Sequence, residues 1–186
     1  MLMTLEKICS DLEAVNSRAV ALFGSLTGEA LARRSNPTKW SVAENLIHLR
    51  ITTETFLPWM EHAINETRQR GFLSAGPYRL GAYGNLLVWY VEPPARIKAA
   101  APAPLKPLLT GPPEEVLPAF LQSQRHAMQQ MKAAHGLDLT KLRFGSPLAK
   151  FVRMNLLELF AVFNGHSRRH LWQAENTLGK TELPVN

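Results

Sequence analysis

The sequence contains a single cysteine, Cys9, among its 186 residues. One thiol cannot form an internal disulfide or a multi-thiolate metal site, so any metal bound by this chain must rest on nitrogen and oxygen ligands. The chain also lacks an apolar run of the roughly 20 residues that a membrane-spanning helix needs. Its first residues, MLMTLEKICSDLE, carry acids where a signal peptide would be basic and then apolar. We therefore expect a protein of a reducing compartment, the cytoplasm, with no membrane partner.

Long basic runs are absent too, although the formal net charge is +6 and the pI is near 9.8. The 21 basic residues are scattered, often in short pairs such as Arg33 with Arg34 and Arg168 with Arg169. No basic helical face and no nucleic-acid motif can be found. We interpret the charge as a solvated basic surface and expect no nucleic-acid partner.

Apolar sequence, in contrast, is plentiful, because 46% of the residues are hydrophobic. A chain of 186 residues suits one domain with a real core and is short for two. Four segments repeat apolar residues three and four positions apart, which is the period of an amphipathic helix. These segments cover about residues 5–26, 41–60, 114–135 and 147–178. We predict an all-α fold, a four-helix bundle that residues 1–186 form as a single domain.

The second helical segment starts within the residues WSVAENLIHL. Ser41 followed three residues later by Glu44 is a capping-box pattern, which predicts the first turn of a helix. Pro58 should kink this helix or end its regular part, because proline lacks a backbone donor and crowds the preceding turn. Residues 67–113 hold most of the prolines and follow neither regular period. We expect them to form the only long crossover, between helices 2 and 3, with a short helix near 84–91.

Three histidines occupy positions that two helices can bring together. His166 and His170 are four residues apart, so both project from the core-facing half of the fourth helix, about 6 Å apart along its axis. Two imidazoles at this spacing can converge on one ion, although such a pair more often makes ordinary core or surface hydrogen bonds. His48 borders the apolar stripe of the second helix and would add a third nitrogen, leaving a fourth position open as catalytic zinc sites do. The remaining histidines are expected to be exposed: His62, His126 and His135.

These residues resemble the motifs of the DinB-like superfamily, whose members are four-helix bundles with a metal bound by three histidines. KWSVAENLIHL is similar to the family's Trp-Ser-x-x-Glu-x-x-x-His-Leu opening of the second helix. RFGSPLAKFVRMNLLELFAVFNGHSRRHLWQ resembles the family's ending in His-x-x-Arg-His-x-x-Gln. The resemblance covers nearly the whole chain. It implies that His48, His166 and His170 are the ligands of a divalent metal ion. Zinc and nickel are the metals we expect first.

Other residues near these histidines are candidates for catalysis. Glu44 lies one turn before the histidine of the second helix, so it would either orient that ring or only cap the helix. Arg169 and Gln173 flank the histidine pair and would meet a substrate anion or a bound water, unless Arg169 has a structural role. Trp40 and Trp172 stand at element ends and are interpreted as packing residues.

An open three-histidine site suggests metal-assisted chemistry. A metal ion in such a site lowers the pKa of a bound water to about 7, or holds a thiol as its thiolate. The resemblance implies a thiol-dependent transferase or isomerase, and alternatively a metal-dependent hydrolase. The chain offers no nucleophile of its own, because Cys9 is remote from the motifs and no Ser-His-acid pattern occurs.

We therefore expect a metal-dependent enzyme that acts on a small molecule with a low-molecular-weight thiol or with water. A module that binds a metal without catalysis is the competing class of function. A homodimer is one possible assembly.

Overall fold

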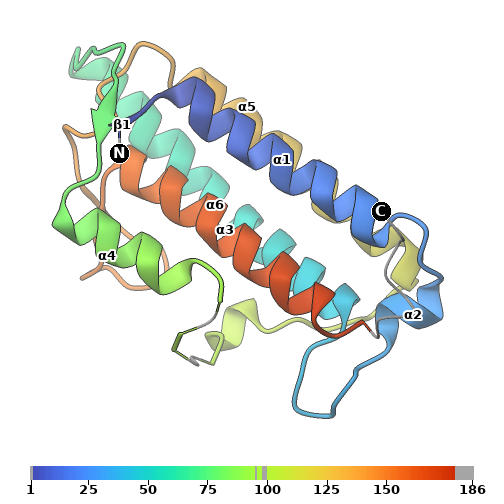
Figure 1. Ribbon diagram of the computed structural model, residues 1–186. Helices are drawn as coiled ribbons and strands as arrows, with labels where there is room; N and C mark the ends of the chain where they lie inside the picture. Colours follow the sequence, from blue (N-terminus) through green and yellow to red (C-terminus); the bar gives the residue numbers. More distant parts are fainter. Residues whose placement is uncertain (1, 95, 98–99, 179–186) are drawn as a thin grey trace.

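The chain is described from a computed structural model that places residues 2–94, 96–97 and 100–178 (Figure 1). Its long helices are α1 (Leu5–Phe23), α3 (Val42–Gln69), α5 (Val116–Ala133) and α6 (Leu156–Glu175). The connections hold two shorter helices and two 3-10 turns: α2 (Gly28–Ala32), α4 (Ala82–Val91), η1 (Ala103–Leu105) and η2 (Pro113–Glu115). Four two-residue strands pair antiparallel, β1 (Leu2–Met3) with β2 (Tyr78–Arg79) and β3 (Phe144–Gly145) with β4 (Arg153–Met154). The predicted all-α class is confirmed.

The four long helices pack as a bundle. α3 contacts α5 and α6, and α1 contacts the same two helices. Figure 1 shows the long helices running side by side, with α4 lying next to α6. The core between them follows the predicted helical period, as the buried residues of α1 illustrate: Leu5, Ile8, Leu12, Val15, Ala19 and Phe23. The predicted four-helix bundle is the observed architecture.

α3 begins at the predicted capping box. Ser41 Oγ accepts the backbone N–H of Glu44 (3.2 Å), and a Glu44 carboxylate oxygen accepts the N–H of Ser41 (2.8 Å). Of the two effects expected of Pro58, an end to the regular helix is wrong, because α3 continues to Gln69, whereas a kink stays a prediction. Pro58 and Glu54, whose carbonyl loses its donor, are both exposed, so water can replace the missing hydrogen bond.

One connection is longer than predicted. Residues 70–115 form the expected crossover between α3 and α5, and α4 lies within it close to the short helix expected near 84–91. The crossover is not the only long connection, however. Residues 134–155 link α5 to α6 and carry the β3–β4 pair.

α6 starts later than the predicted position near residue 147. A second capping box sets its first turn, in which Asn155 Oδ1 accepts the N–H of Glu158 (2.8 Å) and Glu158 accepts the N–H of Asn155 (3.1 Å). Val152 fits the helical spacing of the apolar residues that follow it, which led the prediction to include it, but it lies in the connection before the helix. The prediction therefore began the helix too early.

The crossover is bonded to the half of α6 that carries the histidine pair. Arg168 forms an ion pair with Glu92, just beyond the end of α4. Arg169 donates to the carbonyl oxygens of Tyr90 (2.8 Å) and Ile97 (2.7 Å). These bonds place the crossover against α6, where it forms one wall of the site described below.

Some apolar side chains of the crossover remain exposed. Of the surface of Trp89, 45% is exposed, and the guanidinium of Arg96 lies 5.4 Å from its ring centroid. This exposure does not indicate a membrane span. Within the residues that the structure describes, no helix has the length and hydropathy needed to cross a bilayer.

Candidate metal centre

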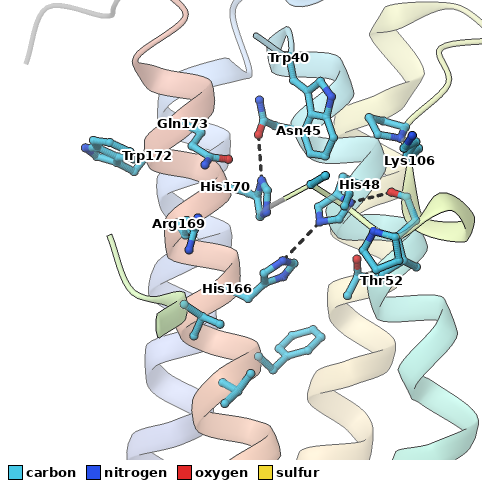
Figure 2. A pocket seen from close by; sticks show the side chains of 18 of the residues that line it. Trp40, Asn45, His48, Thr52, Lys106, His166, Arg169, His170, Trp172 and Gln173 are labelled. Carbon is cyan, nitrogen blue, oxygen red and sulfur yellow. Dashed lines mark hydrogen bonds between the residues drawn. The ribbon is translucent and has the colours of Figure 1, made fainter. Parts of the chain in front are cut away.

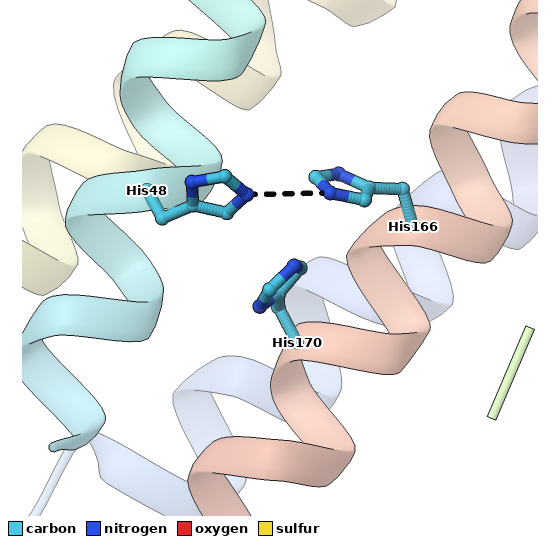
Figure 3. A group of neighbouring side chains, drawn as sticks. All are labelled: His48, His166 and His170. Carbon is cyan, nitrogen blue, oxygen red and sulfur yellow. Dashed lines mark hydrogen bonds between the residues drawn. The ribbon is translucent and has the colours of Figure 1, made fainter. Parts of the chain in front are cut away.

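Three imidazoles from two helices meet between α3 and α6 (Figure 3). His48 projects from α3, and His166 and His170 project from successive turns of α6. The ring centroid of His48 lies 5.2 Å from that of His166 and 4.4 Å from that of His170. One nitrogen from each ring can be chosen so that all three lie within 4.8 Å of one another. The structure thus brings together the three histidines singled out from the sequence, and this cluster could hold a metal ion.

Two of the rings are oriented by hydrogen bonds on the side away from the cluster. His48 Nδ1 lies 2.8 Å from the carbonyl oxygen of Leu105, and His170 Nδ1 lies 3.0 Å from Oδ1 of Asn45. Because both partners are acceptors, each Nδ1 carries the proton and each Nε2 keeps a free lone pair. Asn45 is itself held, since its Nδ2 donates to the carbonyl of Ser41 (2.9 Å). The start of α3 therefore positions the ring of His170.

The third ring faces the first. His166 Nε2 lies 3.3 Å from His48 Nε2. When the proton of His166 is on Nε2, this nitrogen donates to His48 Nε2; when it is on Nδ1, both Nε2 atoms present lone pairs that can bind a metal cation together. Imidazole nitrogens are ligands that zinc and nickel accept readily. The donor set therefore fits a divalent ion of this kind.

The electrostatic surroundings keep all three imidazoles neutral. Burial lowers the pKa of His48 below the usual histidine value, more than its hydrogen bond to Leu105 raises it. Burial, together with repulsion from the protonated form of His48 and from Arg169, lowers the pKa of His166 to about 3. Burial also places the pKa of His170 well below the usual value, with further lowering by the two other histidines and Arg169. Neutral rings are the form that binds metal, so the cluster is ready for an ion at neutral pH.

A cleft of about 1280 Å³ opens beside the cluster (Figure 2). Its walls come from α3, from α6 and from the crossover around Leu105. Trp40 lies over the histidines at one end, 5.0 Å from the ring of His48 and stacked on that of His170 at 5.8 Å. Among the described residues, the metal-ligand group contains three histidines and no carboxylate or thiol. A fourth coordination position would therefore face the cleft.

Thr52 lies in the wall of this cleft, one turn beyond His48. Three other threonines of α3 donate their hydroxyls to the carbonyl four residues earlier: Thr53, Thr55 and Thr67. Thr52 is 9% exposed, and among the described residues its buried hydroxyl has no hydrogen-bond partner. Figure 2 shows the hydroxyl on the side of Thr52 that faces His48. The hydroxyl is thus a free polar group close to the candidate metal position.

Glu44 is fully engaged at the start of α3. Its carboxylate caps the helix and forms an ion pair with Arg34. Burial by itself would raise the pKa of Glu44, but the hydrogen bonds from Arg34 and Ser41 lower it overall. Asn45 and the Leu105 carbonyl, not Glu44, bind the outer nitrogens of the imidazoles. A catalytic role for Glu44 stays a prediction.

The other candidates line the cleft. Arg169 is buried and its two terminal nitrogens donate to backbone carbonyls of the crossover, so it has a structural task whether or not it also acts in catalysis. Gln173 and Trp172 line the cleft toward the same end of the bundle as Trp40 (Figure 2). Trp40 packs on the histidines as expected of a packing residue. The three histidines predicted to be exposed are exposed: His62, His126 and His135.

Two residues of the site were not predicted as functional. Asn45 shares a flank of α3 with His48, and that spacing was the one signal in the sequence that could have marked it. The Leu105 carbonyl is a backbone group in a proline-rich segment without periodicity, so no residue pattern could have indicated it.

The fold and the site together place the protein in the class of helical bundles with a buried three-histidine cluster that lies beside a cleft and could hold a metal ion. The chain belongs to the DinB superfamily, whose family model matches residues 11–174. No curated protein matches the chain, and no solved structure does.

Proposed function

We propose that His48, His166 and His170 bind a divalent metal ion, zinc or nickel, and that the protein is an enzyme that joins a low-molecular-weight thiol to a small-molecule acceptor. The observation that carries this proposal is the position of the cluster, with three neutral imidazoles on one side and a large cleft on the other. Catalytic zinc sites keep one coordination position open in this way, whereas structural sites are closed by a fourth protein ligand.

The lining of the cleft favours a thiol over water as the nucleophile. When bound, the ion supplies a positive charge that lowers the pKa of a thiol or a water at the open position. A free thiol has a pKa of about 8.5 and water one of about 15.7, so a thiol needs far less activation. Among the described residues that line the cleft there is no Asp or Glu to take a proton from water. This supports transfer of a thiol more strongly than hydrolysis.

The nucleophile comes with the substrate in this proposal. Cys9 lies in α1, packed against the main core, and it is not among the residues lining the cleft. Burial raises the pKa of its thiol, which disfavours the reactive thiolate. The protein's own task is to hold the imidazoles, through Asn45 and the Leu105 carbonyl, and to keep Trp40 packed over them. This arrangement leaves the cleft free for the reactants.

The test is consumption of a thiol with chlorodinitrobenzene as acceptor. A sulfur–carbon bond forms, the carbon–chlorine bond breaks, chloride leaves, and the thiol proton passes to solvent. Free cysteine, glutathione and mercaptoethanol are suitable thiols. We expect the wild-type protein to accelerate this reaction and the His48→Ala and His170→Ala variants to lose the acceleration. His126→Ala and Cys9→Ser are the matched controls and are expected to retain it.

Different outcomes point to the other functions. Acceleration that survives in the His170→Ala variant contradicts a metal-dependent transfer. Hydrolysis of esters or amides that depends on His170, without thiol consumption, replaces the transferase with a hydrolase. Metal binding with neither reaction supports the non-catalytic metal-binding module.

A further inference from the structure

The cleft has two chemically different ends, one on each side of the histidines. α3 and α6 run in opposite directions here, so residues late in α3 face residues early in α6 (Figure 2). Beyond Thr52 the lining is apolar and mostly buried: Phe56, Met154, Leu159, Val162 and Phe163. Beyond Trp40 the lining is exposed or half-buried and, apart from Trp172, polar: Thr38, Lys39, Gln173, Asn176 and Thr177. The cluster therefore stands between a deep apolar end and an open polar mouth.

The charge of the lining has one sign. Lys39, Lys106 and Arg169 line the cleft, and no acidic residue does so among the described residues. Arg169 is occupied by its two carbonyl acceptors. Lys39 and Lys106 are exposed at the mouth, and within the described parts of the chain neither makes an ion pair. Such a mouth attracts an anion and repels a cation.

From this geometry we infer that the cleft selects an amphipathic anion, with an apolar chain or ring in the deep end and an acidic group at Lys39 and Lys106. The group that reacts then lies between the two, beside the histidines. The volume of about 1280 Å³ exceeds the upper range of about 1,000 Å³ for small-molecule sites, so the cleft has room for a ligand that extends past the cluster on both sides. The inference rests on the proposed function only in calling this ligand a substrate.

Alkyl sulfonates test the selection without turnover. Sulfonates coordinate metals weakly, so direct bonding to the metal adds little to their binding. A bound divalent ion would still attract anions through space, so the lysine variants below assign the charge effect to the mouth. Calorimetric titration of the protein, with its metal content as purified, compares octanesulfonate with butanesulfonate and with octyltrimethylammonium. Four added methylene groups are expected to tighten binding by up to about 200-fold when they enter the apolar end. Octyltrimethylammonium is expected to bind more weakly than octanesulfonate, by a factor of up to about ten.

Two pairs of variants assign the effects to the two ends. Val162→Asn, in the apolar end, is expected to remove most of the chain-length gain, whereas Val20→Asn, on an exposed face of α1, leaves it intact. Lys39→Gln combined with Lys106→Gln is expected to weaken octanesulfonate binding by about threefold to tenfold. Lys132→Gln, an exposed lysine of α5 outside the cleft, is the control for charge alone. Thermal unfolding confirms that each variant is folded.

Equal affinities for octanesulfonate and butanesulfonate overturn the inference, as does an equal affinity for the cation. A chain-length gain that the Val162→Asn variant retains overturns it too. The outcome of the thiol assay does not depend on the outcome of these titrations. If the sulfonates bind as expected and no thiol is consumed, the transferase is rejected and the cleft preference stands; the reverse pattern rejects only the cleft preference.

Discussion

His48 Nε2 and His166 Nε2 lie 3.3 Å apart across the contact between α3 and α6. Burial lowers the pKa of both rings, so neither imidazole is positively charged at neutral pH. Two neutral imidazoles can satisfy each other here through one hydrogen bond, but apolar side chains would fill the same space without polar groups to satisfy. The proposed metal ion, which the three histidines together could hold, would give this arrangement its physical reason.

Asn45 is expected to control the strength of metal binding. Its Oδ1 accepts from Nδ1 of His170, which fixes the tautomer and the ring orientation. Loss of such an outer hydrogen bond typically weakens metal affinity by about 10- to 100-fold. We expect Asn45→Ala to show this loss in a competition titration of zinc against a chromophoric chelator. Asn65→Ala, an exposed position of the same helix, is the control, and equal affinities in the two variants contradict this role.

The stability of the metal-free protein should depend on pH in one direction. Below about pH 6.5 the unfolded chain takes up protons on its histidines, whereas the folded chain keeps His166 neutral down to about pH 3. The free energy of unfolding should therefore fall as the pH drops from about 6.5 toward 3, by up to about 1.4 kcal/mol per pH unit for each ring that stays neutral. Above pH 6.5 these rings contribute no pH dependence.

Urea unfolding in the presence of a chelator, repeated across this pH range, measures the effect. A His166→Gln variant should show a shallower fall, because one group with a lowered pKa is gone. His135→Gln, which changes an exposed histidine, should keep the wild-type slope. An identical slope in the His166→Gln variant would show that the buried rings do not cause the fall.

Thr52 and Thr53 offer a matched pair for the free hydroxyl in the cleft wall. Thr53 Oγ1 donates to the Leu49 carbonyl (2.8 Å) and accepts from the buried side chain of Gln124 (2.9 Å). Thr53→Val leaves that amide unpaired and should lower the free energy of unfolding by about 1–3 kcal/mol. Thr52→Val removes a hydroxyl without a partner among the described residues, so stability should stay the same or rise by about 1 kcal/mol. Chemical denaturation of the chelator-treated variants decides this, and a comparable loss in both contradicts the assignment of a free hydroxyl.

Much of the bundle and of the histidine cluster could be predicted because local patterns encode them. The capping box of Ser41 and Glu44 placed the start of α3, and with it the turn that carries His48. The four-residue spacing of His166 and His170 required that both rings face one side of α6. Predicting the cluster then needed only the packing of α3 on α6, which the apolar stripes and the family resemblance both favoured.

The parts that could not be predicted depend on contacts between distant segments. The carbonyl of Leu105 reaches His48 from a proline-rich segment in which no period indicates where each residue lies. The start of α6 was misplaced because Val152 is apolar in a connection, where burial against the bundle imitates a helical stripe. Pro58 did not end α3 because its position on the exposed face, a tertiary property, lets water replace the lost bond.

The most direct test of the central claim is the metal content of protein purified without a histidine tag, measured by plasma mass spectrometry. We predict close to one zinc or nickel ion per wild-type chain, and the same content in the His126→Ala variant, which alters an exposed histidine. His170→Ala should lose the ion, because two imidazoles bind a divalent cation far more weakly than three. Equal metal content in the His170→Ala and His126→Ala variants would contradict the account.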